Sequence, residues 1–312
     1  MSAQNTRVLP DGPEAIAEAA RLILAGQPVA MPTETVYGLA ADATNGEAVA
    51  RIYEAKGRPS FNPLIVHVSG LARAAEIATF DDEARALAER YWPGPLTLVL
   101  PLRDGAPIAS LVTAGLATVA IRSPAHPAMQ ALLAAAGRPL AAPSANASGR
   151  ISPTRAAHVL ASLGGRIPLI VDGGATAHGL ESTIVAVTGG TPRLLRPGPL
   201  DLGLAAGDAG DAGDARKIEA PGQLASHYAP AKPVRLNARE AAADEWLIGF
   251  GPVAGDATLS ATGDLVEAAA NLFGKLHDAE AAGAPNIAVA PIPETGLGLA
   301  INDRLRRAAA PR

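Results

Sequence analysis

Short apolar stretches alternate with amphipathic helical stretches along most of this sequence, and that alternation limits the folds open to the chain. The clearest helical stretch spans residues 13–26 and places apolar side chains at i, i+3, i+4 and i+7: Ile16, Ala19, Ala20 and Ile23. Proline at its start and glycine at its end are typical helix boundaries. Apolar runs such as residues 63–68 and 95–102 are typical of buried strands. The pattern predicts an α/β fold with a mixed sheet.

The same reading predicts two domains joined by a linker. Residues 1–200 carry predicted helices at 45–57, 81–92, 126–137 and 152–164, with strands between them and a hairpin over 182–198. Residues 201–230 begin with a Gly/Ala/Asp tract that has no apolar period, which is typical of a flexible linker. Residues 231–312 resume the pattern, with a long helix at 264–283 and another at 298–310, and predict a small Rossmann-like α/β domain.

Charge is spread unevenly but is nowhere strongly basic. The net charge is −4; residues 1–200 hold 16 Lys and Arg against 15 Asp and Glu, and residues 201–312 hold 10 against 15. A protein that lives on nucleic acid is expected to present a basic face. The cations of the first half instead lie beside Gly/Pro/Ser-rich junctions, which favours a local anion site.

Several classes of protein are disfavoured by what the sequence lacks. It contains no cysteine, so disulfides and cysteine–metal sites are excluded. The first 20 residues show no secretory signal pattern and no apolar run is long enough to span a membrane, so we expect a soluble cytoplasmic protein. Walker, GxGxxG, GxSxG and HExxH motifs are missing, so a nucleotide would be bound without the common phosphate loops.

The stretch KGRPSFNPL, residues 56–64, places two cations at the junction of a predicted helix and strand. Lys56 and Arg58 could simply be a solvated helix end. Alternatively, the prolines and glycine fix the direction of two cations that bind an anion.

Polar residues also follow the strands in MPTETVYGL and VAIRSP. Thr33, Glu34 and Thr35 come after a predicted strand, where they could be an N-cap cluster or part of a site. Arg122 ends an apolar run, and a charge emerging from a buried strand needs an anionic partner. His67 lies inside another apolar strand, where a satisfied core histidine is the common alternative to a ligand.

The stretch APSANASGRISPT combines small residues with Ser144, Asn146, Ser148 and Ser152. Their side chains and backbone N–H groups could bind phosphate, helped by a helix expected to begin at residues 152–154. An ordinary Ser/Asn turn is the alternative. The predicted hairpin adds Ser182, Thr183 and Arg196.

Taken in order, PTETVYGLAADA, KGRPSFNPL, YWPGPLTLVL, APSANASGRISPT and ESTIVAV resemble the YrdC-like family. With the linker and second domain, the chain is similar to the long, two-domain threonylcarbamoyl-AMP synthases. The resemblance is strong from about Pro32 to Gly198 and looser through SHYAPAKP and GLGLAINDRLRRA. The paired family signatures Lys-x-Arg and Ser-x-Asn are present as Lys56/Arg58 and Ser144/Asn146.

The resemblance implies a set of roles for individual residues. Lys56 and Arg58 would be the catalytic cations that hold the ATP phosphates. The other residues implied to bind ATP are Asn62, Thr118, Ser144, Asn146, Ser152, Arg196 and Tyr228. The residues implied to bind threonine are Thr35, His67, Arg122, Ala142 and Ser182. His227 and Tyr228 resemble a segment that closes over the site, which predicts that residues 201–230 act as a lid.

The resemblance also implies substrates and partners. The expected reaction converts L-threonine, bicarbonate and ATP into L-threonylcarbamoyl-AMP and pyrophosphate, with Mg²⁺ accompanying ATP and no metal site made by protein residues. The product would feed N6-threonylcarbamoyladenosine formation at tRNA position 37 through downstream transferase proteins, so tRNA contact would be indirect and membrane contact absent. Two alternatives stay open: an RNA-binding module, and a carbamoyl-transfer domain of the same fold. Aromatic residues make up only 3 % of the chain, which disfavours the first alternative.

Overall fold

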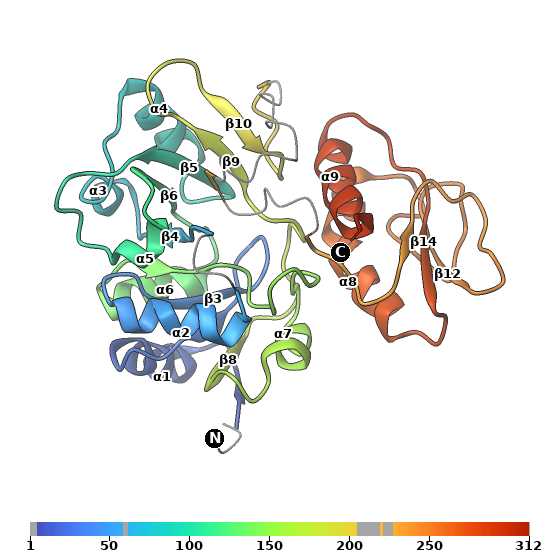
Figure 1. The fold of residues 1–312 in the computed structure, drawn as a ribbon, viewed down its shortest axis with the longest axis horizontal. Helices are drawn as coiled ribbons and strands as arrows, with labels where there is room; N and C mark the ends of the chain where they lie inside the picture. The colour runs from blue at the N-terminus through green and yellow to red at the C-terminus, as the bar shows by residue number, and fades with distance from the viewer. Residues whose placement is uncertain (1–4, 59–61, 205–218, 221–226, 312) are drawn as a thin grey trace.

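The structure, a computed structural model, describes residues 5–58, 62–204, 219–220 and 227–311. Their strands form two separate sheets, a large one in the first two thirds of the chain and a small one in the last third. Figure 1 shows the two sheets side by side, with helices α8 and α9 on the side of the small sheet that faces the large one. The predicted α/β fold with a mixed sheet and a second α/β unit is confirmed.

The large sheet has ten strands in the order β1-β8-β2-β3-β7-β4-β6-β5-β9-β10, with parallel and antiparallel pairs mixed. Its strands are β1 Arg7–Pro10, β2 Val29–Met31, β3 Gly38–Asp42, β4 Ile65–His67, β5 Leu96–Pro101, β6 Thr118–Arg122, β7 Leu140–Ala141, β8 Leu169–Asp172, β9 Thr183–Ala186 and β10 Arg193–Arg196. The predicted hairpin is confirmed, because β9 and β10 pair antiparallel.

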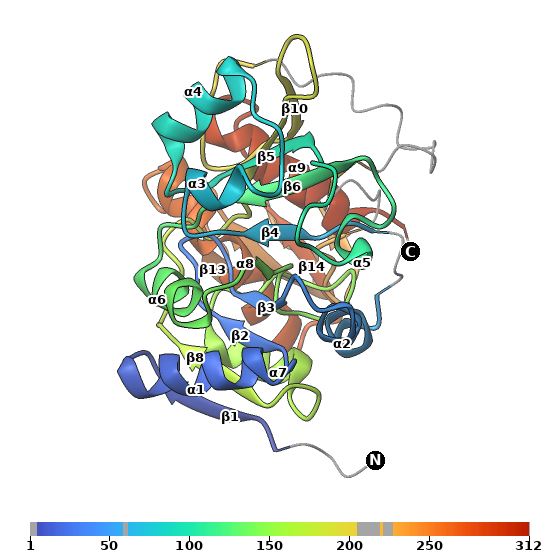
Figure 2. The ribbon, with the colours of Figure 1, turned by 90° about the vertical axis from the view of Figure 1, so that its left-hand side faces the viewer.

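Helices cover both faces of this sheet. Helices α1 (Pro13–Leu24) and α6 (Pro127–Ala136) pack on one face, where they bury Val29 and Met31 of β2. Helices α2 (Gly46–Lys56), α4 (Asp82–Tyr91) and α7 (Ala156–Leu163) pack on the other face, where Ala30 lies. Figure 2 shows α6 and α2 on opposite sides of β3. Both faces of the central strands are therefore buried, which explains their continuous apolar sequences.

The end of α2 shows how the sequence aims a functional side chain. Asn45 caps the helix by accepting hydrogen bonds from the N–H groups of Glu47 and Ala48. Gly57 ends it in the left-handed conformation, at φ 58°, which a residue with a side chain adopts only with strain. Lys56 is thereby fixed as the last helical residue, with only 4 % of its surface exposed. The interpretation of this junction as a solvated helix end is wrong for Lys56.

The small sheet has four parallel strands in the order β11-β14-β12-β13. The strands are β11 Val234–Arg235, β12 Glu245–Gly249, β13 Ala257–Thr258 and β14 Asn286–Val289, and helices α8 (Leu265–Ala281) and α9 (Leu297–Ala309) pack together beside them. One apolar cluster joins this unit to the first, because Val36, Ile151 and Leu180 pack with residues of α8 and α9. At Gly179, φ is 66° and a Cβ would lie 2.5 Å from the carbonyl oxygen of Ala269, so glycine there allows α8 to approach closely.

Several details differ from the sequence-based expectations. Strands β1, β3 and β13 and the short helices α3 (Leu71–Ala74) and α5 (Ser110–Thr113) were not predicted. Helix α7 begins at Ala156, not at residues 152–154, because that segment is extended and the Pro153 carbonyl accepts a hydrogen bond from the Tyr37 N–H. Thr33 caps no helix, since its hydroxyl instead accepts from the N–H groups of Thr35 and Val36 in a turn. Most of the predicted linker lies outside the described residues.

Among the described residues, no helix combines the length and apolar character needed to cross a membrane.

Candidate active site

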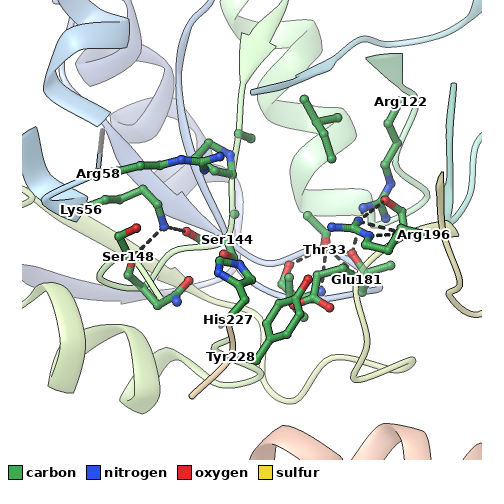
Figure 3. Close-up of a pocket in the computed structure, with 18 of the residues that line it drawn as sticks. Thr33, Lys56, Arg58, Arg122, Ser144, Ser148, Glu181, Arg196, His227 and Tyr228 are labelled. Atoms are coloured by element: carbon green, nitrogen blue, oxygen red, sulfur yellow. Dashed lines mark hydrogen bonds between the residues drawn. The ribbon is translucent and has the colours of Figure 1, made fainter. Parts of the chain in front are cut away.

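A pocket with about 670 Å³ of empty space, part of it open to solvent, lies where the first unit meets the segment leading into the second. Its floor is formed at the carboxyl ends of the parallel strands β4 and β6, where His67 and Arg122 are register partners. Ligands commonly bind at the carboxyl ends of parallel strands, because loops there leave a crevice. Figure 3 shows Lys56 and Arg58 on one side of the pocket, Arg122 and Arg196 on the other, and His227 and Tyr228 between them.

The first corner of the pocket contains Lys56 and Arg58. The Lys56 Nζ donates to the carbonyl oxygens of Ser144, at 2.6 Å, and Asn146, at 2.5 Å. The Arg58 Nη2 donates to the carbonyl of Pro63 at 3.3 Å. Within the part of the chain that the structure describes, neither cation forms an ion pair with a carboxylate. Burial, and then Arg58, lowers the pKa of Lys56 well below its usual value, and burial lowers that of Arg58 to about 10. Buried cations with only carbonyl partners form a strong anion-binding corner.

The loop after β7 closes this corner. An antiparallel bridge joins Ser144 to Gly38, and the Asn146 side chain holds the loop by donating to the carbonyls of Ala147 and Arg150. The Ser148 N–H donates to the carbonyl of Lys56, so the loop and the end of α2 are tied together. The Ser-x-Asn and Lys-x-Arg signatures are therefore parts of one hydrogen-bonded unit.

The second corner is built around Arg122. Its guanidinium forms an ion pair with Glu34 at 2.6 Å and donates to the Thr35 hydroxyl at 2.8 Å and to the Gly94 carbonyl at 3.2 Å. Burial pushes the pKa of Glu34 upward, but the charge and hydrogen bonds of Arg122 more than offset it and hold that pKa at about 2. Glu34 is therefore ionised at neutral pH. Three of the five guanidinium N–H groups are used in these bonds, which leaves donors for a ligand.

His67 lies beside this second corner. It is buried and lines the pocket, and its Nδ1 has no hydrogen-bond partner among the described residues. Burial, reinforced by Arg122, lowers its pKa to about 3, so the imidazole is neutral. An unpartnered ring nitrogen at the pocket favours the interpretation of His67 as a site residue over that of a core residue.

The β9–β10 hairpin supplies a third cation. The Arg196 Nε and Nη2 donate to the Ser182 carbonyl at 3.1 and 2.9 Å, and the Ser182 hydroxyl bonds to that of Thr97 at 2.7 Å. Arg196 is buried at 4 % exposure and lines the pocket together with Ser182. Burial lowers the pKa of Arg196.

His227 and Tyr228 enter the pocket from the segment that precedes the small sheet. The His227 N–H donates to the Arg307 carbonyl of α9. The Ala229 N–H donates to the Gly149 carbonyl in the serine-rich loop, residues 142–155 between β7 and α7. Burial, and then the charges of Arg58 and Lys56, lowers the pKa of His227 to about 3. The segment is thus anchored to both units while its two rings face the pocket.

Most residues that the sequence marked as candidates are brought together here. Thr35, Lys56, Arg58, His67, Arg122, Ala142, Ser144, Asn146, Ser182, Arg196 and Tyr228 all line the pocket. Asn62 and Thr118 do not, but they lie next to the amino ends of the parallel strands β4 and β6. Ile65, which lines the pocket, lies three residues beyond Asn62, about 10 Å along an extended chain.

Ser152 also lies outside the lining, behind Glu181. Its hydroxyl donates to the Glu181 Oε1 at 2.5 Å, and Glu181 lines the pocket. Sequence reasoning assigned no role to Glu181, although it stands in the quoted ESTIVAV stretch. A carboxylate directly before the predicted hairpin was the available signal.

Among the described residues, no group of three or more His, Cys, Asp or Glu side chains could hold a metal ion.

Two family models together match most of the chain. A model described as "Telomere recombination" matches residues 21–198, and one described as "Threonylcarbamoyl-AMP synthase, C-terminal domain" matches residues 183–310. Threonylcarbamoyl-AMP synthase of Bacillus subtilis is 41 % identical over 324 residues, covering 95 % of this chain and 93 % of the relative. The protein of the same name from Pyrococcus abyssi is 40 % identical over 320 residues, covering 94 % of each.

The fold also matches a solved structure along nearly its whole length. The crystal structure of P. abyssi Sua5 complexed with L-threonine superposes with a TM-score of 0.88 at 39 % identity, covering 97 % of each chain.

Proposed function

Because this chain belongs to the threonylcarbamoyl-AMP synthase family, we propose that it makes L-threonylcarbamoyl-AMP and pyrophosphate from L-threonine, bicarbonate and ATP. The observation that carries the proposal is the pocket itself: buried Lys56 and Arg58 with only carbonyl partners face an arginine corner across one cavity. A triphosphate and an amino-acid carboxylate are two of the anions this reaction must hold together.

The reaction has two bond-forming steps. The neutral threonine amine attacks the carbon of bicarbonate, or of the CO₂ in equilibrium with it, and a C–N bond forms. Water leaves when bicarbonate reacts, and the amine releases a proton to solvent when CO₂ reacts. A carbamate oxygen then attacks the α-phosphorus of ATP, an O–P bond forms, and pyrophosphate leaves with the electron pair of the broken P–O bond. Phosphoryl transfer spreads negative charge over oxygens, so it needs positioned cations more than a strong base.

The cations of the pocket suit that requirement. Lys56 and Arg58 act as the catalytic pair that neutralises the phosphates, and Arg196 adds a third positive charge from the hairpin. Ser144 and Asn146 shape the loop under the phosphates. Asn62 and Thr118 hold the outer part of the nucleotide at the far ends of β4 and β6, Ser152 acts through Glu181, and Tyr228 covers the nucleotide.

Threonine is placed at the second corner. The remaining guanidinium donors of Arg122 bind its carboxylate, because a planar fork suits a carboxylate. Thr35, His67, Ala142 and Ser182 complete this side of the pocket. The neutral His67 imidazole leaves the amine free of a competing positive charge.

Mg²⁺ enters as part of the Mg-ATP substrate, with phosphate oxygens as its main ligands. The product leaves for transferase proteins that complete N6-threonylcarbamoyladenosine at position 37 of tRNA, in the cytoplasm, without direct tRNA recognition by this chain. The division into a catalytic domain (1–200), a lid-bearing linker (201–230) and a second domain (231–312) belongs to the same proposal and is supported by the two separate sheets.

Product identity tests this function. The purified full chain is mixed with L-threonine, bicarbonate and Mg-ATP, and the products are separated and weighed by mass spectrometry. We expect threonylcarbamoyl-AMP and pyrophosphate in equal amounts, with no pyrophosphate when threonine or bicarbonate is omitted. Cleavage of ATP to ADP and phosphate, or pyrophosphate release that does not need threonine, would refute the proposal.

A further inference from the structure

The stretch GLGLAINDRLRRA resembles the family, but the proposed function gives it no task. It forms α9, and its Arg304 side chain is 0 % exposed although α9 belongs to the second unit. An isolated buried guanidinium is costly, so its partners should explain why it is there.

Arg304 contacts Glu181 of the first unit. Its Nε donates to the Glu181 Oε2 at 2.9 Å, and the other carboxylate oxygen accepts from the Ser152 hydroxyl at 2.5 Å. One carboxylate thus connects α9 to the serine-rich loop. The two side chains of the ion pair are only 0 % and 8 % exposed, so solvent screens it little.

The same guanidinium contacts two other walls of the pocket. Its Nη1 donates at 2.8 Å to the carbonyl of Pro197, the residue directly after Arg196, and at 2.8 Å to the Asp303 Oδ2 on its own helix. Its central carbon lies 5.4 Å from the centroid of the Tyr228 ring, within range of a cation–π contact. Burial opposes its charge, but Tyr228, Glu181 and Asp303 together raise the pKa of Arg304 above its usual value, so it is always a cation.

These contacts share one property. Apart from the ion pair with Asp303 on its own helix, each leads to a residue proposed to hold ATP: Ser152 through Glu181, Arg196 through the residue after it, and Tyr228 directly. None leads to Thr35, His67 or Ala142 on the threonine side, although Ser182, which follows Glu181 and accepts from Arg196, lies near them. A residue needed only to dock the two units could be apolar, because well-packed apolar groups often replace buried ion pairs without loss of stability.

We propose that Arg304 is the positioning residue by which the second unit shapes the ATP side of the pocket, holding Glu181, the Pro197 peptide and the Tyr228 ring in place together. This inference rests on the proposed function only for the identity of the nucleotide. Arg304 touches no substrate. It acts by holding the Glu181 carboxylate, the Pro197 carbonyl and the Tyr228 ring at fixed distances from one another. A planar guanidinium with five donors can contact all three at once, whereas the single ammonium group of a lysine cannot.

The test compares Arg304→Lys and Arg304→Met with Arg306→Met in the full chain. Arg306 lies on the same helix and pairs with Glu294 at the surface, so it is a matched control. Calorimetry measures the Kd for a Mg-bound ATP analogue with a non-cleavable α,β link and the Kd for threonine, and a thermal melt measures stability. We expect Arg304→Lys to raise the ATP-analogue Kd about tenfold and the threonine Kd less than about threefold, with Arg306→Met unchanged.

Arg304→Met leaves Glu181 buried without its countercharge and is expected to melt earlier. The double variant Arg304→Met/Glu181→Gln removes both charges, and the introduced amide oxygen can still accept from Ser152. We expect this double variant to regain the wild-type melting temperature but not the wild-type ATP-analogue affinity. Wild-type affinity in the stable double variant, or equal losses for ATP and threonine in Arg304→Lys, would overturn the proposal.

Direct binding keeps this test separate from the synthase test. A wild-type chain that binds the analogue but makes no threonylcarbamoyl-AMP would refute the proposed function, and the variants would still decide the role of Arg304. A wild-type chain that does not bind the analogue would refute both.

Discussion

Two corners of one pocket treat buried positive charge in opposite ways. Lys56 is held by neutral carbonyl oxygens and Arg58 by another, whereas Arg122 is held by the ionised carboxylate of Glu34. Carbonyls orient a cation without cancelling its charge, so the first corner keeps a field for a ligand. The ion pair of the second corner cancels most of its own field and serves chiefly as a shaped donor surface. The charges of Lys56 and Arg58 are thus left for a ligand, whereas the charge of Arg122 mainly holds Glu34 and the shape of the second corner.

Lys56→Met should break the first corner and produce the largest effect. We expect pyrophosphate release to fall at least about 100-fold, because the field on the phosphates is lost where solvent is excluded. The melting temperature should stay the same or rise, because a buried cation with only neutral partners costs stability. Steady-state kinetics and a thermal melt measure both, with Lys275→Met, an unrelated lysine on α8, as the control. A variant that melts earlier but retains its activity would contradict this view of the corner.

Arg122→Ala should have the next largest effect, and with the opposite balance. Loss of a charged hydrogen bond to threonine is worth roughly 1.5–3 kcal/mol, about ten- to hundredfold in threonine affinity. The melting temperature should also fall, because Glu34 is left ionised and buried. Binding calorimetry with each substrate separates the two requirements.

A matched double variant sharpens that prediction. Arg122→Ala/Glu34→Gln removes both charges and should recover stability while threonine binding stays weak. If ATP binding were lost and threonine binding kept in either variant, the assignment of the two corners would be reversed.

The smallest effect is expected at the contact between α7 and α8, where two neutral histidine rings meet. The rings of His158 on α7 and His277 on α8 stack with centroids 3.9 Å apart. Burial, and then His277, lowers the pKa of His158 to about 4, and burial lowers that of His277. The charged neighbours are Arg155, which opposes protonation, and Asp278 and Glu280, which favour it.

The sign of the pH effect follows from these lowered values. The unfolded histidines take up protons near pH 6.5 and the folded ones do not, so stability is full above that pH and declines from about 6.5 toward 4. Thermal melts at pH 7 and pH 5 should show the decline. His158→Phe should reduce it by on the order of 1 kcal/mol, after allowance for partial exposure. An unaltered difference between the two pH values would exclude this pair as a source.

The sequence predicted elements whose apolar period is strong and missed those that are short or built from small residues. Helix α1 follows from its four periodic apolar residues, all of them buried. Strand β3, GLAAD, lies in the middle of the large sheet yet has neither β-branched nor aromatic residues, so no local signal marks it. Its burial by helices on both faces makes it a strand.

In the site too, signals from neighbouring residues could be recognised in the sequence, whereas contacts between residues far apart in the chain could not. Lys56 and Arg58 could be singled out because a helix stop, a glycine and prolines surround them. The pairing of Glu34 with Arg122 spans 88 residues, and that of Glu181 with Arg304 spans 123. No local spacing encodes such partners, because only the sheet order and the docking of α9 bring them together. Motif resemblance located the residues but not which carboxylate each arginine meets.

The placement of Arg304 has a consequence for the order of events during synthesis. A ribosome adds about 5–20 residues per second, so the 123 residues between Glu181 and Arg304 take roughly 6–25 s to make. Every strand of the large sheet precedes Glu181 in the chain except the two of the hairpin, β9 and β10, which follow directly. A nascent chain can therefore form most of its larger unit before Arg304, the ion-pair partner of Glu181, has been synthesised. If Arg304 positions the ATP side of the pocket as proposed, that side becomes competent only after α9 has emerged and docked, so completion of the chain also activates the enzyme.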